Sequence, residues 1–288
     1  SGDHQNLHSF PTRRSSDLII AISDLHVGSY EGLFPRDGFR LDNGAVQQPS
    51  RFQEYLLECW DHFWGEWVPR ATKGIALKNT TLVLNGDVVD GNHHQAVNLI
   101  PNVVMQEQAA VKILKPITQK YRSFMVRGTE AHGGKSDQNT ESVARQLGCE
   151  LDESGMQSVW QLWLEGEGVV FQLAHHIGTT SSAAYETSAP MRELVAGLVE
   201  SAQWDQRLPD VMVRSHRHRY NEVSIPRSGD REIRLVVTPG WQLRTPFVEK
   251  IDRMRLPHIG GVVFIVEDGV CQVKTKLYDM PKPNLIQI

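Results

Sequence analysis

The chain has 288 residues and a mass of 32.5 kDa, so its length allows one large α/β domain or two smaller ones. With 40% hydrophobic and 22% charged residues, its composition excludes collagen-like, low-complexity and fully disordered proteins. The formal net charge of -4 excludes a global positive field that would bind nucleic acid or an anionic membrane non-specifically.

The N-terminal segment does not resemble a natural protein. Residues 8–18 are similar, position by position, to the translation of a common sequencing-library adapter. The alternative is a natural leader rich in Arg and Ser, but the segment has no apolar h-region. We therefore expect residues 1–18 to be a non-native or disordered leader and the true start of the protein to be missing.

A β-α-β pattern follows the leader. Two short apolar runs, 19–22 and 81–84, predict buried strands that end in polar residues. Between them, large apolar side chains recur at steps of three and four from Phe52 to Trp67, which is the spacing of one helical face. We expect the tryptophans of this stretch to lie in the core.

Two further helices and a strand are predicted before Gly148. The second helical pattern is interrupted by two prolines and leads into the strand, which ends in a loop. The predicted ranges are 95–121 for this helix, 123–128 for the strand with its loop and 136–147 for the next helix.

After Gly148 the pattern changes to alternating, β-branched and aromatic runs, which predict strands. One helical stretch, 190–204, separates these runs, and Trp241 in a Pro-Gly-Trp turn is a candidate for lining a pocket. The predicted strands are 159–164, 169–173, 211–213, 233–237, 262–266 and 270–276.

Helix-linked strands in the first half and a strand-rich second half predict an α/β fold with two facing mixed β-sheets flanked by helices. We expect one domain over residues 19–277, with a candidate cap insert at about 178–204. Residues 278–288 are predicted to be an extended C-terminal tail.

The three cysteines, Cys59, Cys149 and Cys271, are too far apart for a disulfide framework or a CxxC zinc site. A reducing, cytoplasmic setting is therefore expected. The longest apolar runs are much shorter than the roughly 18 residues of a membrane-spanning helix. The sequence thus predicts no membrane partner.

Histidines gather where the predicted strands end. Of the 12 histidines, eight lie at or just beyond such ends: His26, His93, His94, His132, His175, His176, His216 and His218. Asp24, Asp87 and Asp90 accompany them. Imidazole and carboxylate ligands without cysteine favour Zn, Mn or Fe. The number of candidate ligands exceeds the number of protein ligands that one ion takes. Two divalent metal ions sharing a bridging carboxylate are expected.

Four of these segments resemble, in order and spacing, four of the five motifs of the calcineurin-like metallophosphoesterases. They are Ser23-Asp24-Leu25-His26, Asn85-Gly86-Asp87-Val88-Val89-Asp90, Ala174-His175-His176 and Ser215-His216-Arg217-His218. The resemblance covers about residues 19–276 and implies an α/β/β/α sandwich. It also implies hydrolysis of phosphomonoesters or phosphodiesters by direct attack of a metal-bridging hydroxide.

The resemblance further implies the ligands of each metal. Asp24, His26 and His218 would hold the first ion, His175 and His216 the second, and Asp87 would bridge both. Strand alternation points the rings of His175 and His176 in opposite directions, so only one of them should bind, and we favour His175.

The remaining family motif is altered. The family has Gly-Asn-His after the third strand, whereas this chain has Gly128-Thr129-Glu130-Ala131-His132. Thr129 has an oxygen but a shorter reach than Asn, Glu130 could replace the missing amide with a charged oxygen, and His132 is a third alternative for the ligand. His132 is also our candidate general acid for the leaving group. The alternative for His132 is an ordinary surface histidine.

Substrate contacts are predicted for Arg217, which lies inside the HxH motif, and for His94. The expected partner is a compact phosphoester; nucleic acid is an alternative that the net charge does not favour, and the sequence leaves the oligomeric state open.

Two functional alternatives are a metal-dependent nuclease and a catalytically impaired metal-binding module, the latter because of the altered motif. A third is a nucleotide-binding P-loop at residues 129–136, which lacks the first glycine of that motif.

Overall fold

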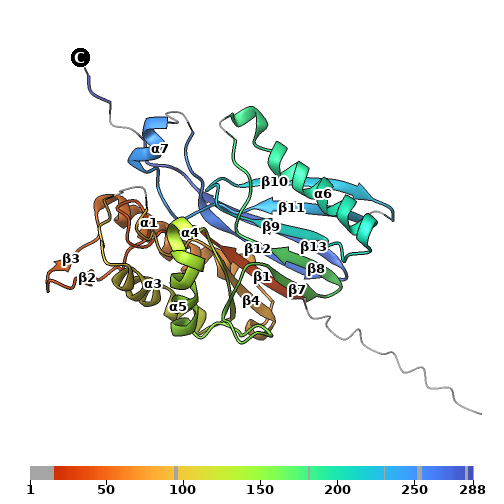
Figure 1. Ribbon diagram of the computed structural model, residues 1–288, viewed down its shortest axis with the longest axis horizontal. Coiled ribbons are helices and arrows are strands. Elements are labelled where there is room, and N and C mark those ends of the chain that lie inside the picture. The colour runs from red at the N-terminus through yellow and green to blue at the C-terminus, as the bar shows by residue number, and fades with distance from the viewer. Residues whose placement is uncertain are drawn as a thin grey trace, which may run out of the picture.

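The computed structural model describes residues 16–93, 97–180, 182–229, 231–251, 255–282 and 285–287. Two β-sheets face one another, and helices cover the outer face of each (Figure 1). The predicted α/β fold with two facing mixed sheets is confirmed. Most of the predicted leader lies outside the described residues, although the first strand already begins at Asp17.

The first sheet has the strand order β13-β12-β1-β4-β5-β6. Strands β1, β4, β5 and β6 run parallel, and β12 and β13 add an antiparallel edge. Helices on one side and the second sheet on the other bury β1 on both faces, so its sequence is a continuous apolar run. The bounds are β1 Asp17–Ile22, β4 Thr80–Asn85, β5 Arg122–Val126, β6 Ser158–Val159, β12 Ile259–Glu267 and β13 Val270–Tyr278.

The second sheet has the order β10-β11-β9-β8-β7, in which β8, β9 and β11 run parallel. The bounds are β7 Leu162–Gly166, β8 Val169–Leu173, β9 Val211–Arg214, β10 Asn221–Arg227 and β11 Arg231–Val237. A separate two-stranded ribbon joins β2 Phe39–Arg40 and β3 Val46–Gln47.

Two strand predictions need correction. The predicted strand 159–164 is two strands, because the chain leaves the first sheet after β6 and enters the second at β7. Strand β10 was not predicted, because it is an edge strand whose polar residues and Pro226 weaken the apolar pattern.

Side-chain caps mark the starts of two helices. Ser50 and Gln53 form a capping box at the start of α1, and Asn102 caps α3, which begins after Pro101 rather than at the predicted residue 95. The helices are α1 Arg51–His62, α2 Val68–Ala71, α3 Val103–Thr118, α4 Glu130–Gly133, α5 Gln138–Leu147, α6 Ser188–Trp204 and α7 Pro246–Ile251. Short η segments lie at Phe63–Trp67, which is π-helical, and at Leu77–Asn79, Lys135–Asp137 and Ala183–Tyr185.

Three apolar clusters match the layers. One lies between the first sheet and α1, α3 and α5, the second between the two sheets, and the third between the second sheet and α6. Most of the predicted cap segment is therefore helix α6, which covers β10 and β11. A covering role for residues 178–187 stays a prediction.

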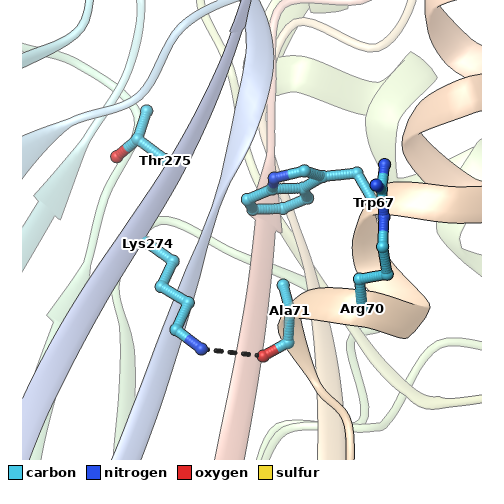
Figure 2. A pocket seen from close by; sticks show the side chains of 5 residues that line it. All are labelled: Trp67, Arg70, Ala71, Lys274 and Thr275. Atoms are coloured by element: carbon cyan, nitrogen blue, oxygen red, sulfur yellow. Dashed lines mark hydrogen bonds between the residues drawn. The ribbon is translucent and has the colours of Figure 1, made fainter.

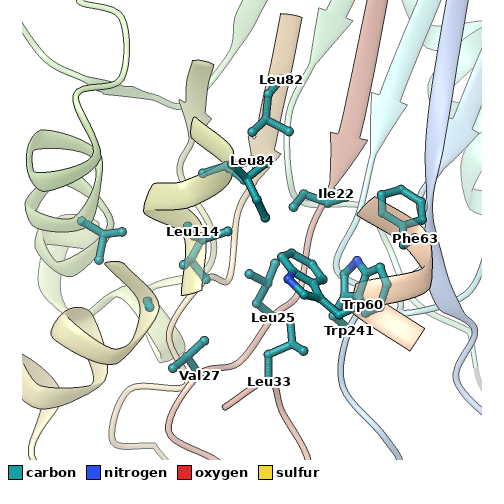
Figure 3. Packing of buried hydrophobic residues seen from close by; sticks show 14 of the residues in the cluster. Ile22, Leu25, Val27, Leu33, Trp60, Phe63, Leu82, Leu84, Leu114 and Trp241 are labelled. Atoms are coloured by element: carbon teal, nitrogen blue, oxygen red, sulfur yellow. The ribbon is translucent and has the colours of Figure 1, made fainter. Parts of the chain in front are cut away.

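The first cluster is mostly aliphatic and includes three aromatic side chains that lie together, Trp60, Phe63 and Trp241 (Figure 3). The rings of Trp60 and Trp241 meet edge to face, with 4.7 Å between their centroids, and Phe63 packs beside them. Trp241 is fully buried in this core and does not line a pocket, contrary to its prediction. Its backbone N–H donates to Asp24 O at 2.9 Å, which ties the core to the polar loop after β1.

No helix in the described part of the chain is long and apolar enough to cross a membrane. All three cysteines are free thiols, with Cys59 and Cys149 buried and Cys271 half-buried. A surface hollow of about 530 Å³ lies between α2 and β13, and Figure 2 shows the side chains that line it. Its lining residues are Trp67, Arg70, Ala71, Lys274 and Thr275, none of which belongs to the predicted site.

Candidate metal centre

The predicted site residues follow the carboxyl ends of four strands. Loops after β1 and β4, which are parallel neighbours in the first sheet, meet loops after β8 and β9, which are parallel neighbours in the second. Parallel strands end at the same edge, so their loops gather side chains from distant parts of the chain. The residues brought together are Asp24, His26, Asp87, His175, His216 and His218.

The backbone of this site is unusual. Asp24, His26, Asp87, His216 and His218 all have positive φ angles, between 45° and 71°. Residues other than glycine rarely adopt this left-handed conformation, and such strain concentrates at functional sites. Hydrogen bonds between the loops hold it here, including Asp24 N–H to Gly86 O and His26 N–H to Asp87 O, both 3.1 Å.

The first group of convergent side chains is Asp24, His26 and His218. The Nε2 atom of His218 lies 3.3 Å from Asp24 Oδ1 and 3.1 Å from His26 Nε2. Asp24 is completely buried, and its Oδ1 atom accepts no hydrogen bond from any described residue although imidazole nitrogens surround it. An unpaired buried carboxylate oxygen is costly, so this arrangement fits a cation ligand.

The second group is Asp87, His175 and His216. The Nε2 atom of His175 lies 2.9 Å from Asp87 Oδ2, and Nδ1 of His216 lies 4.0 Å from the same oxygen. His175 Nε2 is also 3.8 Å from Asp24 Oδ1, so the two groups are contiguous. Asp87 lies between both sets of imidazoles, since it also groups with His26.

Contacts behind these residues fix their orientation. The Nδ1–H of His175 donates to Asn85 O at 2.7 Å, which leaves Nε2 facing the carboxylates. Asp90 Oδ1 lies 3.1 Å from His26 Nδ1 and orients that ring in the same way. Thr129, at the altered motif, donates its backbone N–H to Asp87 Oδ1 at 2.7 Å. Each ring and carboxylate therefore has a restricted orientation before any ion binds.

Close packing around Asp87 requires glycine at one position. A Cβ added to Gly128 would lie 2.1 Å from Asp87 Oδ1, so no side chain fits between this loop and the carboxylate. Gly128 thereby lets the loop after β5 approach the site.

The electrostatics are those of buried carboxylates held by imidazoles. Burial opposes ionisation of Asp24, but His218 and His175 outweigh it and keep the pKa of Asp24 well below its usual value. Burial of Asp87 is likewise outweighed by His175, which keeps the pKa of Asp87 low. Burial would lower the pKa of His175, yet Asp87 and Asp24 raise it to about 9. A positive charge is thus favoured at the point where these side chains meet.

His132 lies at the edge of both groups. Its Nδ1–H donates to Asp90 O at 2.7 Å, and its Nε2 is 3.9 Å from Asp87 Oδ2. Burial, together with the nearby His26, lowers the pKa of His132 to about 4, so the ring is neutral at pH 7. His132 also lies close enough to Asp90 and His93 for the three side chains to hold a metal ion together. All three residues are named in the sequence analysis, which did not predict that they form one group.

The other predicted residues are placed less centrally. Glu130 is exposed at the start of α4 and takes part in none of the convergent groups of described residues. His94 lies outside the described residues. The exposed His176 ring lies tilted against the His216 ring, with 4.7 Å between their centroids, and Arg217 donates from Nη1 to Glu186 O at 2.7 Å.

The backbone hydrogen bonds of residues 129–136 do not fit the P-loop alternative. A P-loop presents free backbone N–H groups to phosphate. Here helix α4 uses them, since Gly133 N–H donates to Thr129 O at 2.8 Å and Gly134 N–H to Glu130 O at 3.1 Å.

No family model and no curated protein matches this chain. Among solved structures, it is similar to Vps29 from Entamoeba histolytica complexed with zinc, with TM-score 0.36, 10% identity and coverage of 91% of this chain and 99% of that one. It is also similar to a predicted phosphoesterase from Streptococcus pneumoniae, with TM-score 0.36, 11% identity and coverage of 91% and 90%. A metallophosphoesterase from Sphaerobacter thermophilus gives TM-score 0.38, 11% identity and coverage of 91% and 89%. At these values the matches carry no functional argument, so function is inferred below from the side chains alone.

Proposed function

We propose that this chain is a metal-dependent phosphoesterase that hydrolyses phosphomonoester or phosphodiester bonds with two divalent cations. The observation that carries the proposal is the convergence of Asp24, Asp87 and four imidazoles, from loops of both sheets, in two contiguous groups that could each hold a cation. In the described residues, no Lys or Arg forms an ion pair with either carboxylate; their ion-pair partners are imidazoles.

The donor set supports the ligands suggested by the sequence. Asp24, His26 and His218 would hold one cation, His175 and His216 the other, and Asp87 both. Nitrogen and oxygen donors without sulfur favour Mn, Zn or Fe. When bound, such a cation pair polarises phosphoryl oxygens, neutralises developing charge and acidifies water to provide the nucleophile.

The chain's own residues orient and complete the site. Thr129 holds Asp87 in place through its backbone N–H and hydroxyl group, at 2.7 and 3.2 Å from Oδ1. His132 is the proposed general acid; because its Nδ1–H is donated to Asp90 O and the ring is neutral at pH 7, Nε2 must first take up a proton before it can pass one to the leaving-group oxygen. Arg217 and His94 remain the proposed substrate contacts. Glu130 keeps only its sequence-based prediction of a catalytic role.

The proposed partner is a phosphoester, and the proposed setting is cytoplasmic. The three free cysteines are consistent with reducing conditions.

The test is turnover of p-nitrophenyl phosphate and bis-p-nitrophenyl phosphate with Mn, Zn or Mg, alongside elemental analysis. We expect about two metal ions per chain and metal-dependent hydrolysis. The variant His218→Ala should lose the bound metal and the hydrolysis. The control His62→Ala should keep both, because the half-exposed His62 ring contacts Tyr278 and not the proposed ligands. Bound metal without turnover of any phosphoester would instead indicate the impaired metal-binding module.

A further inference from the structure

Two arginines and a glutamate form an ion-paired cluster beside the metal centre. Arg219 contacts Glu186 through Nε–Oε1 at 2.6 Å and Nη2–Oε2 at 3.3 Å, and Arg255 Nη1 reaches the same Oε1 atom at 3.2 Å. The Glu186 side chain is only 13% exposed. This carboxylate therefore fixes two guanidinium groups in place.

A third arginine, Arg217, joins the cluster without using the carboxylate. Its Nη1 donates to the backbone oxygen of Glu186 at 2.7 Å, and it forms no ion pair with any described Asp or Glu. The side chain is half-buried. A half-buried guanidinium that contacts only a carbonyl is favourable where an anion binds beside it.

The position of Arg217 relates this charge to the reaction. It lies between His216 and His218 in the chain, so its Cα is about 3.8 Å from the Cα of each. His216 and His218 belong to the two different groups of proposed metal ligands. An anion held by Arg217 would thus lie next to the scissile phosphate and occupy a separate position.

We propose that Arg217 forms a second phosphate subsite that selects small substrates carrying another phosphoryl group near the scissile ester. Arg219 bonds Glu186 and Leu256 O through its guanidinium nitrogens, so it contributes positive charge beside the subsite and Arg217 makes the contact. The proposal rests on the phosphoesterase function and names its substrate class. The planar guanidinium fork matches the geometry of phosphate oxygens. A simple phosphomonoester would leave this subsite without an anion.

The first experiment measures binding without catalysis. Inorganic phosphate is titrated against the protein in EDTA, and broadening of its ³¹P signal is recorded. We expect broadening in the wild type and in Arg207→Ala, a matched surface change at a residue that pairs with Glu165. The broadening should be lost in Arg217→Ala and weakened in Arg217→Lys, which keeps the charge but not the fork. Equal broadening in all four proteins would overturn the subsite.

The second experiment compares kcat/KM for adenosine 3′,5′-bisphosphate and adenosine 5′-monophosphate in the metal-loaded protein. The bisphosphate should be favoured by about tenfold, corresponding to one charge-assisted contact. The ratio should fall towards one in Arg217→Ala and stay unchanged in Arg207→Ala. A wild-type ratio near one, or a stronger preference for a DNA oligonucleotide, contradicts the proposal. Absence of all turnover contradicts the phosphoesterase function instead, and the EDTA titration still decides the subsite.

Discussion

His26 and His218 point their Nε2 atoms at one another at 3.1 Å, although 192 positions separate them in the sequence. Only one of these nitrogens can donate a hydrogen bond to the other, whereas one cation can accept a lone pair from both. The unpaired Oδ1 atom of Asp24 lies 3.3 Å from His218 Nε2 and completes the group.

Asp87→Asn should reduce both metal content and phosphoesterase turnover by orders of magnitude. An amide is a weaker ligand than a carboxylate and cannot hold two cations in common. Elemental analysis and turnover of bis-p-nitrophenyl phosphate provide the measurements. The matched control is Asp61→Asn, which removes an exposed carboxylate paired with Arg36. Wild-type rates in Asp87→Asn would end the assignment of Asp87 as a bridge.

His132→Ala should retain metal but slow substrates with poor leaving groups most, because those depend most on protonation. The measurement is the slope of log kcat against leaving-group pKa in the variant and the wild type. Equal slowing across all leaving groups would argue against a general acid. Loss of metal would show that His132 is a ligand, the role for which its neutral ring and its grouping with His26 and Asp87 are also suited.

Asp90→Ala should weaken metal binding by about 10- to 100-fold while the protein stays folded, because Asp90 orients the His26 ring from behind. Competition with a chelating dye measures the affinity. Asp90→Asn keeps an acceptor for His26 Nδ1 and should recover part of the loss. Unchanged affinity in the alanine variant would remove Asp90 from the support of the site.

Asp137→Asn should make stability less dependent on pH. Burial raises the pKa of Asp137 to about 6, against hydrogen bonds from Thr140 and from the Gly128 N–H. The folded state therefore favours the protonated acid, and its stability falls as the pH rises from the ordinary Asp pKa of 3.8 through about 6. The full effect is roughly 3 kcal/mol, of which about 1 kcal/mol falls between pH 5 and pH 7.

Urea denaturation in EDTA at pH 5 and pH 7 checks this prediction. The decline in the free energy of unfolding should be smaller in Asp137→Asn than in the wild type. Parallel declines in the two proteins would show that Asp137 does not titrate in this range.

Much of the fold was predictable because the period of apolar residues reports the local hydrogen-bonding pattern. The run 19–22 and the helical face from Phe52 to Trp67 are examples, and both were observed as strand and helix. The split of 159–164 between two sheets was not predictable, since a short apolar run does not record which sheet each residue joins. Trp241 was misplaced because its burial depends on Trp60, which is far away in the chain.

The sequence by itself determined which ligand types were available and that each lies just after a strand. Only the tertiary structure decided which of them meet. The burial of His175 beside exposed His176, the contact of Thr129 with Asp87 and the bracing of Arg219 by Glu186 all depend on loop backbones from different strands. Their positive φ angles and the packing of two sheets are set by contacts distant in sequence, and local periodicity carries no record of such contacts.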